Sequence, residues 1–505
     1  MRFNSIFFLF FCFYTKLIGQ TDLVKIDAKL ETESYHRTLV NNGEIFFLRE
    51  IESKELTEKK IILSSLDAYS LKQNWNLELT IGQFSNIQSF VYSDSALFIF
   101  MVNHNLDNKI AELQLKKISA QNGKVLIDSV VWAINIGVWQ NSLGKAEVAQ
   151  TFLSALDSKQ NENEVTPLEY RINLSYSPDS TKVAAFLYDN SHERLYVDAL
   201  VFELSTLTKV HQLKYAIDDA YLAYGAKIDN LGEIYQLKVG LSGKLAVMKV
   251  NLQNEVSDYL QIPAGSSEKV NPQLFIHQNH RVYLSYCLVK LNSLVGISIT
   301  TLDFDNLTVE DSHTYMFDAD FLKRQEEQLK NGNNFFELAE IEEHDNKLFL
   351  VLEQHLIEGI DVMYNPKTSE KLENWHEKFA TVTTGNVLVL VYDKQLNLLN
   401  CLEIPKTQKG IIYDGLNTLG HYLAYYNNEM YFLYTKSTKG LVNDQLIVQK
   451  LDKVINTWSE YKQISLEKGH LPLVTSSCIL DNKRILVHTR KGITEKDNYI
   501  KIYEY

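Results

Sequence analysis

The chain of 505 residues has a net charge of −13, with 63 Asp and Glu residues against 50 Lys and Arg. This surplus of negative charge repels phosphate backbones, so we expect no nucleic-acid partner. Hydrophobic residues make up 45% of the chain and charged residues 22%, which excludes a disordered protein. Only 7 prolines and 21 glycines accompany 28 tyrosines and 24 phenylalanines, a composition that favours β-strands.

The first twenty residues are typical of a secretory signal. Arg2 supplies the positive start, the run from Ile6 to Tyr14 is apolar, and cleavage is expected near Gly19 or Gln20. A bilayer span needs roughly 20 apolar residues, and Lys16 interrupts this run, so an uncleaved anchor is the weaker alternative. We therefore expect an exported protein, periplasmic or extracellular, whose mature chain 21–505 has no integral membrane segment.

One short unit recurs along the rest of the chain: a polar turn with Asn or Asp, followed by a strongly apolar strand. Asn and Asp suit tight hairpins because they tolerate left-handed backbone and hydrogen-bond their own chain. Several intervals between successive turns are about fifty residues, a common length for a propeller blade. The turns are marked by Asn42, Asp94, Asp179, Asn230, Asn279, Asp345, Asn427 and Asp481.

Each unit continues into two more strand-like runs, as in 194–215, so every copy holds four strands in meander order. Such a repeat predicts an all-β fold, a single eight-bladed β-propeller, with seven blades as the alternative. Three longer intervals coincide with apolar residues at helical spacing. They predict short helical insertions near 143–157, 318–332 and 368–379, the second capped by Asp318 or Asp320.

The two ends of the mature chain complement each other. The eighth copy stops one strand short, at residues 499–505, while the alternating run 23–30 has no blade of its own. Pairing between these segments would complete the last blade and leave no unpaired terminal edge. We expect a propeller over 21–505 that is closed in this way.

The turn Ser177-Pro178-Asp179-Ser180, followed by Val183-Ala184, resembles the SPDG-type repeat of TolB-like propellers. Ser180 stands where that repeat has glycine, and the other copies are looser. Propellers of this kind occur in periplasmic scaffolds and in front of some peptidases, so the resemblance implies the propeller superfamily and no specific family.

Catalytic and cofactor signatures are absent from the sequence: it has no phosphate-binding loop, nucleophile elbow or zinc motif. We therefore expect no catalytic residue, cofactor or metal ion. His277 and His280 flank one turn and Asp303 and Asp305 share one strand face, but each pair lacks the further ligands that a metal site needs. Surface residues are the better interpretation of both pairs.

In a propeller, the loops between second and third strands gather on one face, where ligands commonly bind. Those loops supply a mixed set of acids, bases and histidines that could hold a polar ligand or simply be solvated. The candidate ligand-binding residues are His104, Asn105, Asp189, His192, Glu193, Arg194 and Arg490.

Two functions fit these features. The first is a non-enzymatic scaffold in the cell envelope that binds a protein or an envelope polymer. The second is a propeller lyase or hydrolase acting on a glycan or peptide at the channel mouth, since propellers host such chemistry with scattered residues.

Overall fold

The computed structural model describes 24–26, 33–135 and 172–505. Within these ranges it omits 42, 53–57, 83–84, 106–109, 190–194, 218–220, 241–243, 251–256, 264–267, 278–280, 291–292, 324–332, 345, 363–377, 405, 407, 413–420, 427–428, 436–444, 453–456, 460, 468–469, 475–476 and 492–497. The fold is an all-β, eight-bladed β-propeller, with eight sheets of four or five strands. Contacts divide it into two compact units, one of 1–80, 356–386 and 404–505 and the other of 81–355 and 387–403.

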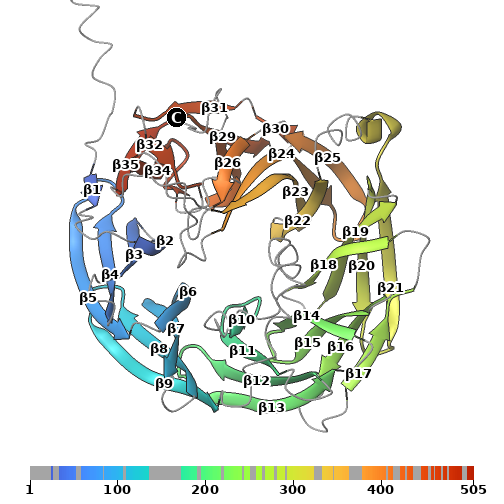
Figure 1. Cartoon of the computed structure of the whole chain (residues 1–505), viewed down its shortest axis with the longest axis horizontal. Helices are drawn as coiled ribbons and strands as arrows, with labels where there is room; N and C mark the ends of the chain where they lie inside the picture. Colours follow the sequence, from blue (N-terminus) through green and yellow to red (C-terminus); the bar gives the residue numbers. More distant parts are fainter. Residues whose placement is uncertain are drawn as a thin grey trace, which may run out of the picture. The chain divides into compact units, whose positions relative to one another are not determined.

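Four complete sheets belong to the second unit, each a meander of four strands (Figure 1). The second sheet comprises β6 (Ser85–Ser93), β7 (Ala96–Asn105), β8 (Ile110–Ser119) and β9 (Val125–Asn135). The third comprises β10 (Asn173–Tyr176), β11 (Lys182–Asp189), β12 (Leu195–Glu203) and β13 (Lys209–Ile217). The fourth comprises β14 (Tyr221–Ile228), β15 (Ile234–Gly240), β16 (Leu245–Val250) and β17 (Ser257–Gln261). The fifth comprises β18 (Glu268–Ile276), β19 (Val282–Lys290), β20 (Ser293–Asp303) and β21 (Thr308–Met316).

The remaining sheets follow the same meander with small additions. The first comprises β2 (Glu33–Asn41), β3 (Glu44–Glu52), β4 (Glu58–Asp67) and β5 (Gln73–Gly82). The sixth comprises β22 (Asn333–His344), β23 (Lys347–Val362), β24 (Lys378–Tyr392), β25 (Leu398–Ile404) and β26 (Gln408–Ile412). The seventh comprises β27 (His421–Tyr426), β28 (Glu429–Thr435), β29 (Gln445–Asp452), β30 (Thr457–Trp458) and β31 (Lys462–Ser465).

The eighth sheet joins the two ends of the chain. It comprises β32 (His470–Pro472), β33 (Cys478–Ile479), β34 (Arg484–Lys491), β35 (Asn498–Glu504) and β1 (Val24–Ile26). Its outer strand β1 pairs antiparallel with β35, with Val24 opposite Ile500. The amino-terminal segment thus covers the edge that β35 would otherwise expose.

The eight Asn and Asp turn residues all fall between the first and second strands of their sheets. Four of them, Asn42, Asn279, Asp345 and Asn427, lie outside the described residues. Asp94 has a φ of 48°, the left-handed conformation that motivated the choice of these residues. Ser180, which replaces the glycine of the SPDG-type repeat, also has a positive φ of 58°. The repeat therefore keeps its turn geometry without its glycine.

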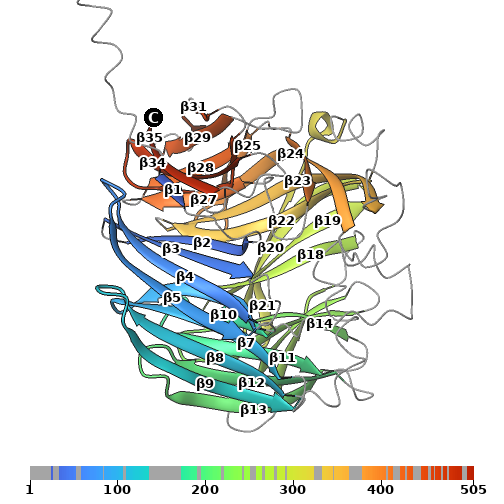
Figure 2. The same cartoon turned by 60° about the vertical axis from the view of Figure 1, so that its left-hand side comes forward.

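Alternate side chains of each second strand enter the cores on the two sides of its sheet. In β11, Val183 and Ala185 pack with the second sheet, while Ala184 and Phe186 pack with the fourth. Figure 2 shows the second and third sheets as neighbouring layers of strands. Because both faces are buried, the second strands are continuous apolar runs rather than alternating ones.

The described residues include one short helix at a predicted helical insertion. Residues 319–323 form one short helix, capped by Asp318, whose carboxylate accepts a hydrogen bond from the Phe321 N–H at 2.7 Å. The expected helix at 143–157 and residues 324–332 lie outside the described part of the chain. The expectation for 368–379 is wrong at its end, because Lys378 and Phe379 already begin β24, which extends to pair with β26. No helix among the described residues has the length and apolarity to cross a bilayer.

A leucine with left-handed backbone recurs in the turn between the third and fourth strands. The φ angles are 54° for Leu71, 60° for Leu207, 53° for Leu307 and 59° for Leu396. Leu71 and Leu396 are buried in the cores between sheets, whereas Leu307 is 46% exposed. A non-glycine residue in this conformation costs about 1–2 kcal/mol, so burial of the side chain explains leucine at two of these positions.

This difference gives a matched pair of substitutions. Leu307→Gly is expected to raise the free energy of unfolding by about 0.5 kcal/mol, because it relieves the left-handed strain and removes little buried surface. Leu396→Gly relieves the same strain but empties a core position, with an expected net loss of about 2–3 kcal/mol. Urea denaturation of both variants measures the two values. Equal effects of the same sign would contradict the anchoring role of Leu396.

Candidate ligand-binding site

The predicted loop-face residues sit at the ends of second strands or just beyond them. His104 and Asn105 end β7, Asp189 ends β11, and Arg490 is the last residue but one of β34. The structure describes their backbones only. His192, Glu193 and Arg194 lie outside the described residues. Binding at this set of residues therefore stays a prediction.

A pocket of about 430 Å³ lies elsewhere, at the first strands of successive sheets in the second unit. The strands β10, β14, β18 and β22 contact one another in this order (Figure 1). The lining residues come from these strands and from β15: Asn173, Leu174, Gly225, Ala226, Lys227, Leu237, Asn271, Pro272, Gln273, Leu274, Phe275, Leu338 and Ile341. The size falls within the usual range of small-molecule and cofactor sites.

Two β-bulges shape this pocket. The register of β14 against β15 shifts between Ala223 and Gly225, and that of β18 against β19 shifts between Val270 and Gln273. In the second bulge, Asn271 has a φ of 49° and is followed by Pro272, which has no N–H for the ladder. Bulges re-aim side chains and occur often next to functional sites.

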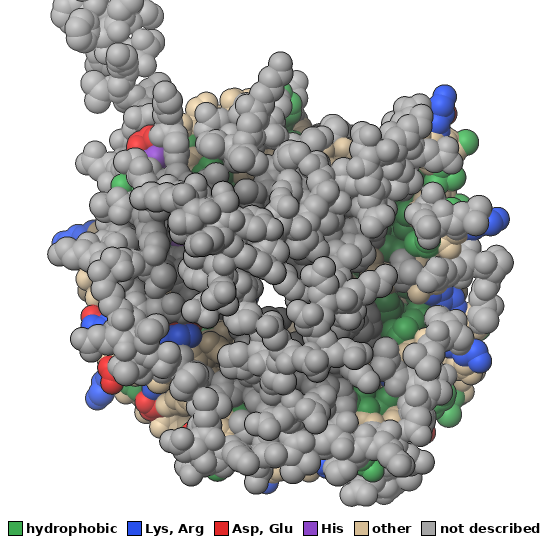
Figure 3. Space-filling model, in the orientation of Figure 1, with side chains coloured by type: hydrophobic (Ala, Val, Ile, Leu, Met, Phe, Trp, Pro, Cys, Tyr) green, Lys and Arg blue, Asp and Glu red, His purple; other side chains and the backbone are tan. Residues whose placement is uncertain are grey.

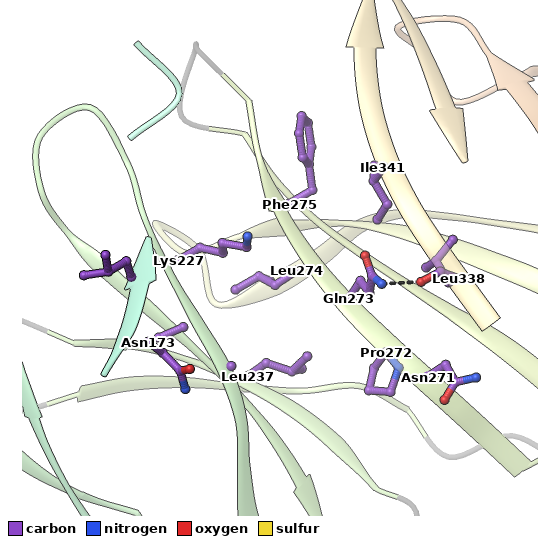
Figure 4. Close-up of a pocket in the computed structure, with 13 residues that line it drawn as sticks. Asn173, Lys227, Leu237, Asn271, Pro272, Gln273, Leu274, Phe275, Leu338 and Ile341 are labelled. Atoms are coloured by element: carbon purple, nitrogen blue, oxygen red, sulfur yellow. Dashed lines mark hydrogen bonds between the residues drawn. The ribbon is translucent and has the colours of Figure 1, made fainter. Parts of the chain in front are cut away.

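Polar groups of the pocket come from β14 and from β18. Figure 4 shows the Lys227 side chain extending from β14 towards Leu274, with Gln273 beyond it. The Gln273 amide donates a hydrogen bond to the Leu338 carbonyl of β22, which ties the fifth sheet to the sixth. Asn173 and Asn271 place two more carboxamides in the lining.

Among the described residues that line the pocket, Lys227 is the only one with a charged side chain. Although it is accessible from the pocket, protein surrounds it, and this desolvation lowers the pKa of its ammonium group; the negative charge of Glu342 opposes the shift. No carboxylate of the described residues lies within ion-pair distance of its Nζ. A bound anion would therefore meet a cation that is poorly solvated and not yet neutralised.

A buried polar cluster lies behind Asn173, between the third and fourth sheets. The Tyr215 hydroxyl donates to Gln236 Oε1 at 3.0 Å, and Gln236 Nε2 donates to the Gly225 carbonyl at 2.7 Å. The Tyr188 hydroxyl is buried and makes no hydrogen bond of normal geometry to the described residues, although Asn173 and Gln236 lie close to it. Burial raises the pKa of Tyr188 far above its usual range, so its hydroxyl stays protonated.

A histidine–carboxylate pair lies near one end of the pocket. Glu343 belongs to β22, and His277 directly follows β18. His277 Nε2 contacts the Glu343 carboxylate; these residues come two positions after Phe275 and Ile341, which line the pocket. Asp179 and Asn230 also join consecutive turns, through a hydrogen bond from the Asp179 N–H to Asn230 Oδ1 at 3.0 Å. The His277 contact thus has a structural counterpart between the third and fourth sheets.

The other metal-ligand candidates have local roles. Asp303 Oδ1 accepts hydrogen bonds from the Asp305 and Asn306 N–H groups, at 2.9 and 3.1 Å, and closes a turn. Hydrogen bonds from Asn306 hold the pKa of the Asp303 carboxyl below its usual value. His280 lies outside the described residues, among which no group of three or more His, Cys, Asp or Glu side chains is placed to share a metal ion.

Figure 3 shows where the charged side chains of the described residues lie on one face. The described Lys and Arg side chains lie there singly, apart from one another, and form no continuous patch among the described residues.

The pocket was not predicted from the sequence, although two residues in its strands signal it. Gly225 and Pro272 each interrupt an apolar strand, and such residues often mark a bulge or a close approach by a ligand.

Comparison with known proteins identifies no family. The sequence matches no protein-family profile and no curated protein. Solved structures with similar folds include a prolyl endopeptidase, with 11% identity, a TM-score of 0.42 and coverage of 91% of this chain and 55% of the other. The chain thus spans about half the length of that peptidase.

Two further structures are propellers from microorganisms. TolB from Acinetobacter baumannii shares 10% identity with a TM-score of 0.31, over 83% of this chain and 78% of its own. The β-propeller domain of the trilobed protease from Pyrococcus furiosus shares 10% identity with a TM-score of 0.36, over 83% and 97%. The eight sheets of the chain itself agree with the propeller predicted from the sequence, and no specific family is identified.

Proposed function

We propose that this protein is an exported binding propeller of the cell envelope, which holds a segment of another protein or of an envelope polymer in the pocket between β10, β14, β18 and β22. The observation that carries the proposal is the lining itself. Three carboxamides, one cation and several apolar side chains surround one space of about 430 Å³. Such a set supplies hydrogen bonds, charge and apolar contact, which are the elements of recognition.

Export is part of the same proposal and rests on the signal-like residues 1–20. The mature chain would begin near Gly19 or Gln20 and work in the periplasm or outside the cell. Mass spectrometry of the amino terminus after fractionation of the native cells tests this part. Intact residues 1–20 in the cytoplasmic fraction would refute it.

Gly225 offers a direct way to block the pocket. A Cβ placed at this residue meets no atom within 4 Å, and its φ is not in the left-handed region, so a side chain here would enter open space. We expect Gly225→Trp to fill the pocket and abolish co-purification of the native partner from the envelope. Gly225→Ala is the matched control and should retain the partner, with both variants showing the melting temperature of the parent.

Retention of every co-purified partner by folded Gly225→Trp would overturn the pocket as the binding site. Loss with both variants would point to damage of the β14 bulge instead, so the melting temperature decides between the two interpretations. In that case, Ala226→Trp, which also enters the lining from β14, repeats the test at a position outside the bulge.

A second candidate function is a lyase or hydrolase acting on a glycan or peptide. The His277–Glu343 contact favours it, because a histidine oriented by a carboxylate is a common general base or acid. The test is incubation of the purified protein with envelope glycans and peptides, followed by detection of cleaved products. Turnover that disappears in His277→Gln would establish the enzyme; intact substrates recovered with the protein would support the binding function.

A further inference from the structure

The residues that line the pocket indicate a more specific class of ligand than a segment of an unspecified partner. The inference that follows rests on the proposed binding function. Three features of the described residues carry it: the cation of Lys227, the carboxamides of Asn271 and Gln273, and the apolar wall that includes Phe275 and Ile341.

The cation selects for one negative group. Lys227 has no ion-pair partner among the described residues, and Figure 4 shows its side chain extending among the residues that line the pocket. Glu342 acts on it only at longer range. An anion at Lys227 would form a charge-assisted hydrogen bond in surroundings less polar than water, where such a bond is strong.

The chain as a whole disfavours a polyanion. Its net charge of −13 repels an acidic polymer that carries many carboxylates, whereas a single carboxylate at the end of a ligand meets little of this repulsion. The one lysine among the described lining residues can pair with one negative charge of a ligand, not with a row of them. A ligand that ends in a single carboxylate therefore fits the lining better than an acidic polysaccharide does.

The carboxamides match a peptide group. Gln273 donates its amide N–H to the Leu338 carbonyl, so its Oε1 is directed as an acceptor by a bond within the protein. Asn271 is held at the adjacent bulge by its left-handed backbone. A peptide N–H is a donor for such oxygens, and fixed side-chain amides are typical of the few polar groups that orient a ligand in an apolar pocket.

The apolar part of the lining matches a hydrocarbon side chain. Leu338 and Ile341 are buried in the core between the fifth and sixth sheets, and Phe275 is half-buried beside them. Leu274 is buried on the opposite face of β18, in the core shared with the fourth sheet. A sugar ring would place hydroxyl groups against Phe275 and Ile341 without partners, which costs free energy. A leucine-like or phenylalanine-like side chain would instead gain about 1.5–3 kcal/mol from leaving water.

We propose that the pocket binds the carboxy-terminal residue of a polypeptide whose last side chain is apolar. The terminal carboxylate lies at Lys227, the last peptide group contacts Asn271 and Gln273, and the side chain packs against Phe275 beside Ile341. The partner is thus a protein with a free, apolar carboxy-terminal tail long enough to reach the first strands.

Fluorescence anisotropy with a labelled pentapeptide that ends in leucine tests the assignment. The probe with a free terminal carboxylate should bind at least tenfold more tightly than the same peptide with a terminal amide. Lys227→Met should remove this difference by weakening the free-acid probe alone, while Lys227→Arg should retain most of it. Lys209→Met, which removes an exposed lysine of β13, is the matched control and should change nothing.

Each alternative outcome has a defined meaning. Equal binding of the acid and the amide, or a preference that survives Lys227→Met, overturns the carboxylate assignment. Binding of a glucuronic-acid disaccharide in place of the peptide overturns the ligand class. If no peptide binds but Gly225→Trp still removes the native partner, this inference fails while the proposed function stands.

Discussion

Ile500→Asp is expected to remove most of the stability of the folded chain. Ile500 is 1% exposed, lies in β35 between Val24 of β1 and His488 of β34, and packs in the same core as Ile45 and Phe47 of the first sheet. The substitution deletes apolar burial worth about 1.5–3 kcal/mol and places a carboxyl group in a core where an unpaired charge costs several kcal/mol more. We expect a total loss above about 5 kcal/mol, which is comparable with the whole stability of many domains.

Leu126→Asp provides the matched control. The same chemical change takes place in β9, where Leu126 is 51% exposed, and the expected effect is within about 0.5 kcal/mol. Circular dichroism during urea denaturation measures both variants. Similar denaturation midpoints for the two would contradict the packing of the eighth sheet against the first.

Most of the propeller could be predicted because its turns and strands depend on local residues. Asp94 takes a positive φ in a two-residue hairpin turn and Ser180 does so in the five-residue turn between β10 and β11, and the strands that follow carry unbroken apolar runs. In the sequence, the polar turn and the apolar run repeat eight times, so an error in one copy does not change the blade count. The apolar runs lack alternation because each second strand is buried on both faces, which also explains why single-strand periodicity is uninformative here.

The helical expectation for 368–379 is wrong at its end, where strand pairing overrides local spacing. Phe379 has helical spacing from Leu372 in the sequence, yet β24 begins at Lys378 and its next residues pair with β26. The backbone hydrogen bonds of a sheet outweigh weak helix propensity in such a segment. The short helix 319–323 has the cap that the sequence indicated, at Asp318.

The pocket could not be predicted because it depends on contacts between sheets that are far apart in sequence. Gln273 and Leu338 meet through a hydrogen bond across 65 positions of the chain, and no linear motif encodes this. The leucines with left-handed backbone could not be predicted from the sequence for a related reason. Turn chemistry favours glycine or asparagine at positive φ, and Leu396 is accepted there because its side chain fills a core between two sheets.

Phe100→Ala is expected to cost about 3–5 kcal/mol, the second largest effect among these substitutions. Phe100 is fully buried in β7, in the core between the second and third sheets. Its ring centroid lies 6.1 Å from that of Phe202 and 6.2 Å from that of Tyr176, which belong to the third sheet. The truncation would leave a cavity that neighbouring strands, fixed by their ladders, can fill only in part.

A double-mutant cycle separates the ring contact from simple loss of volume. Phe100→Ala and Phe202→Ala together should cost less than the sum of the two single changes, by about 0.5–1.5 kcal/mol, because each removes the same aromatic pair. Urea denaturation of the parent, the two single variants and the double variant gives the four free energies of unfolding that the cycle needs. Strict additivity would mean that the second and third sheets do not share this core, since residues without a common contact show no coupling.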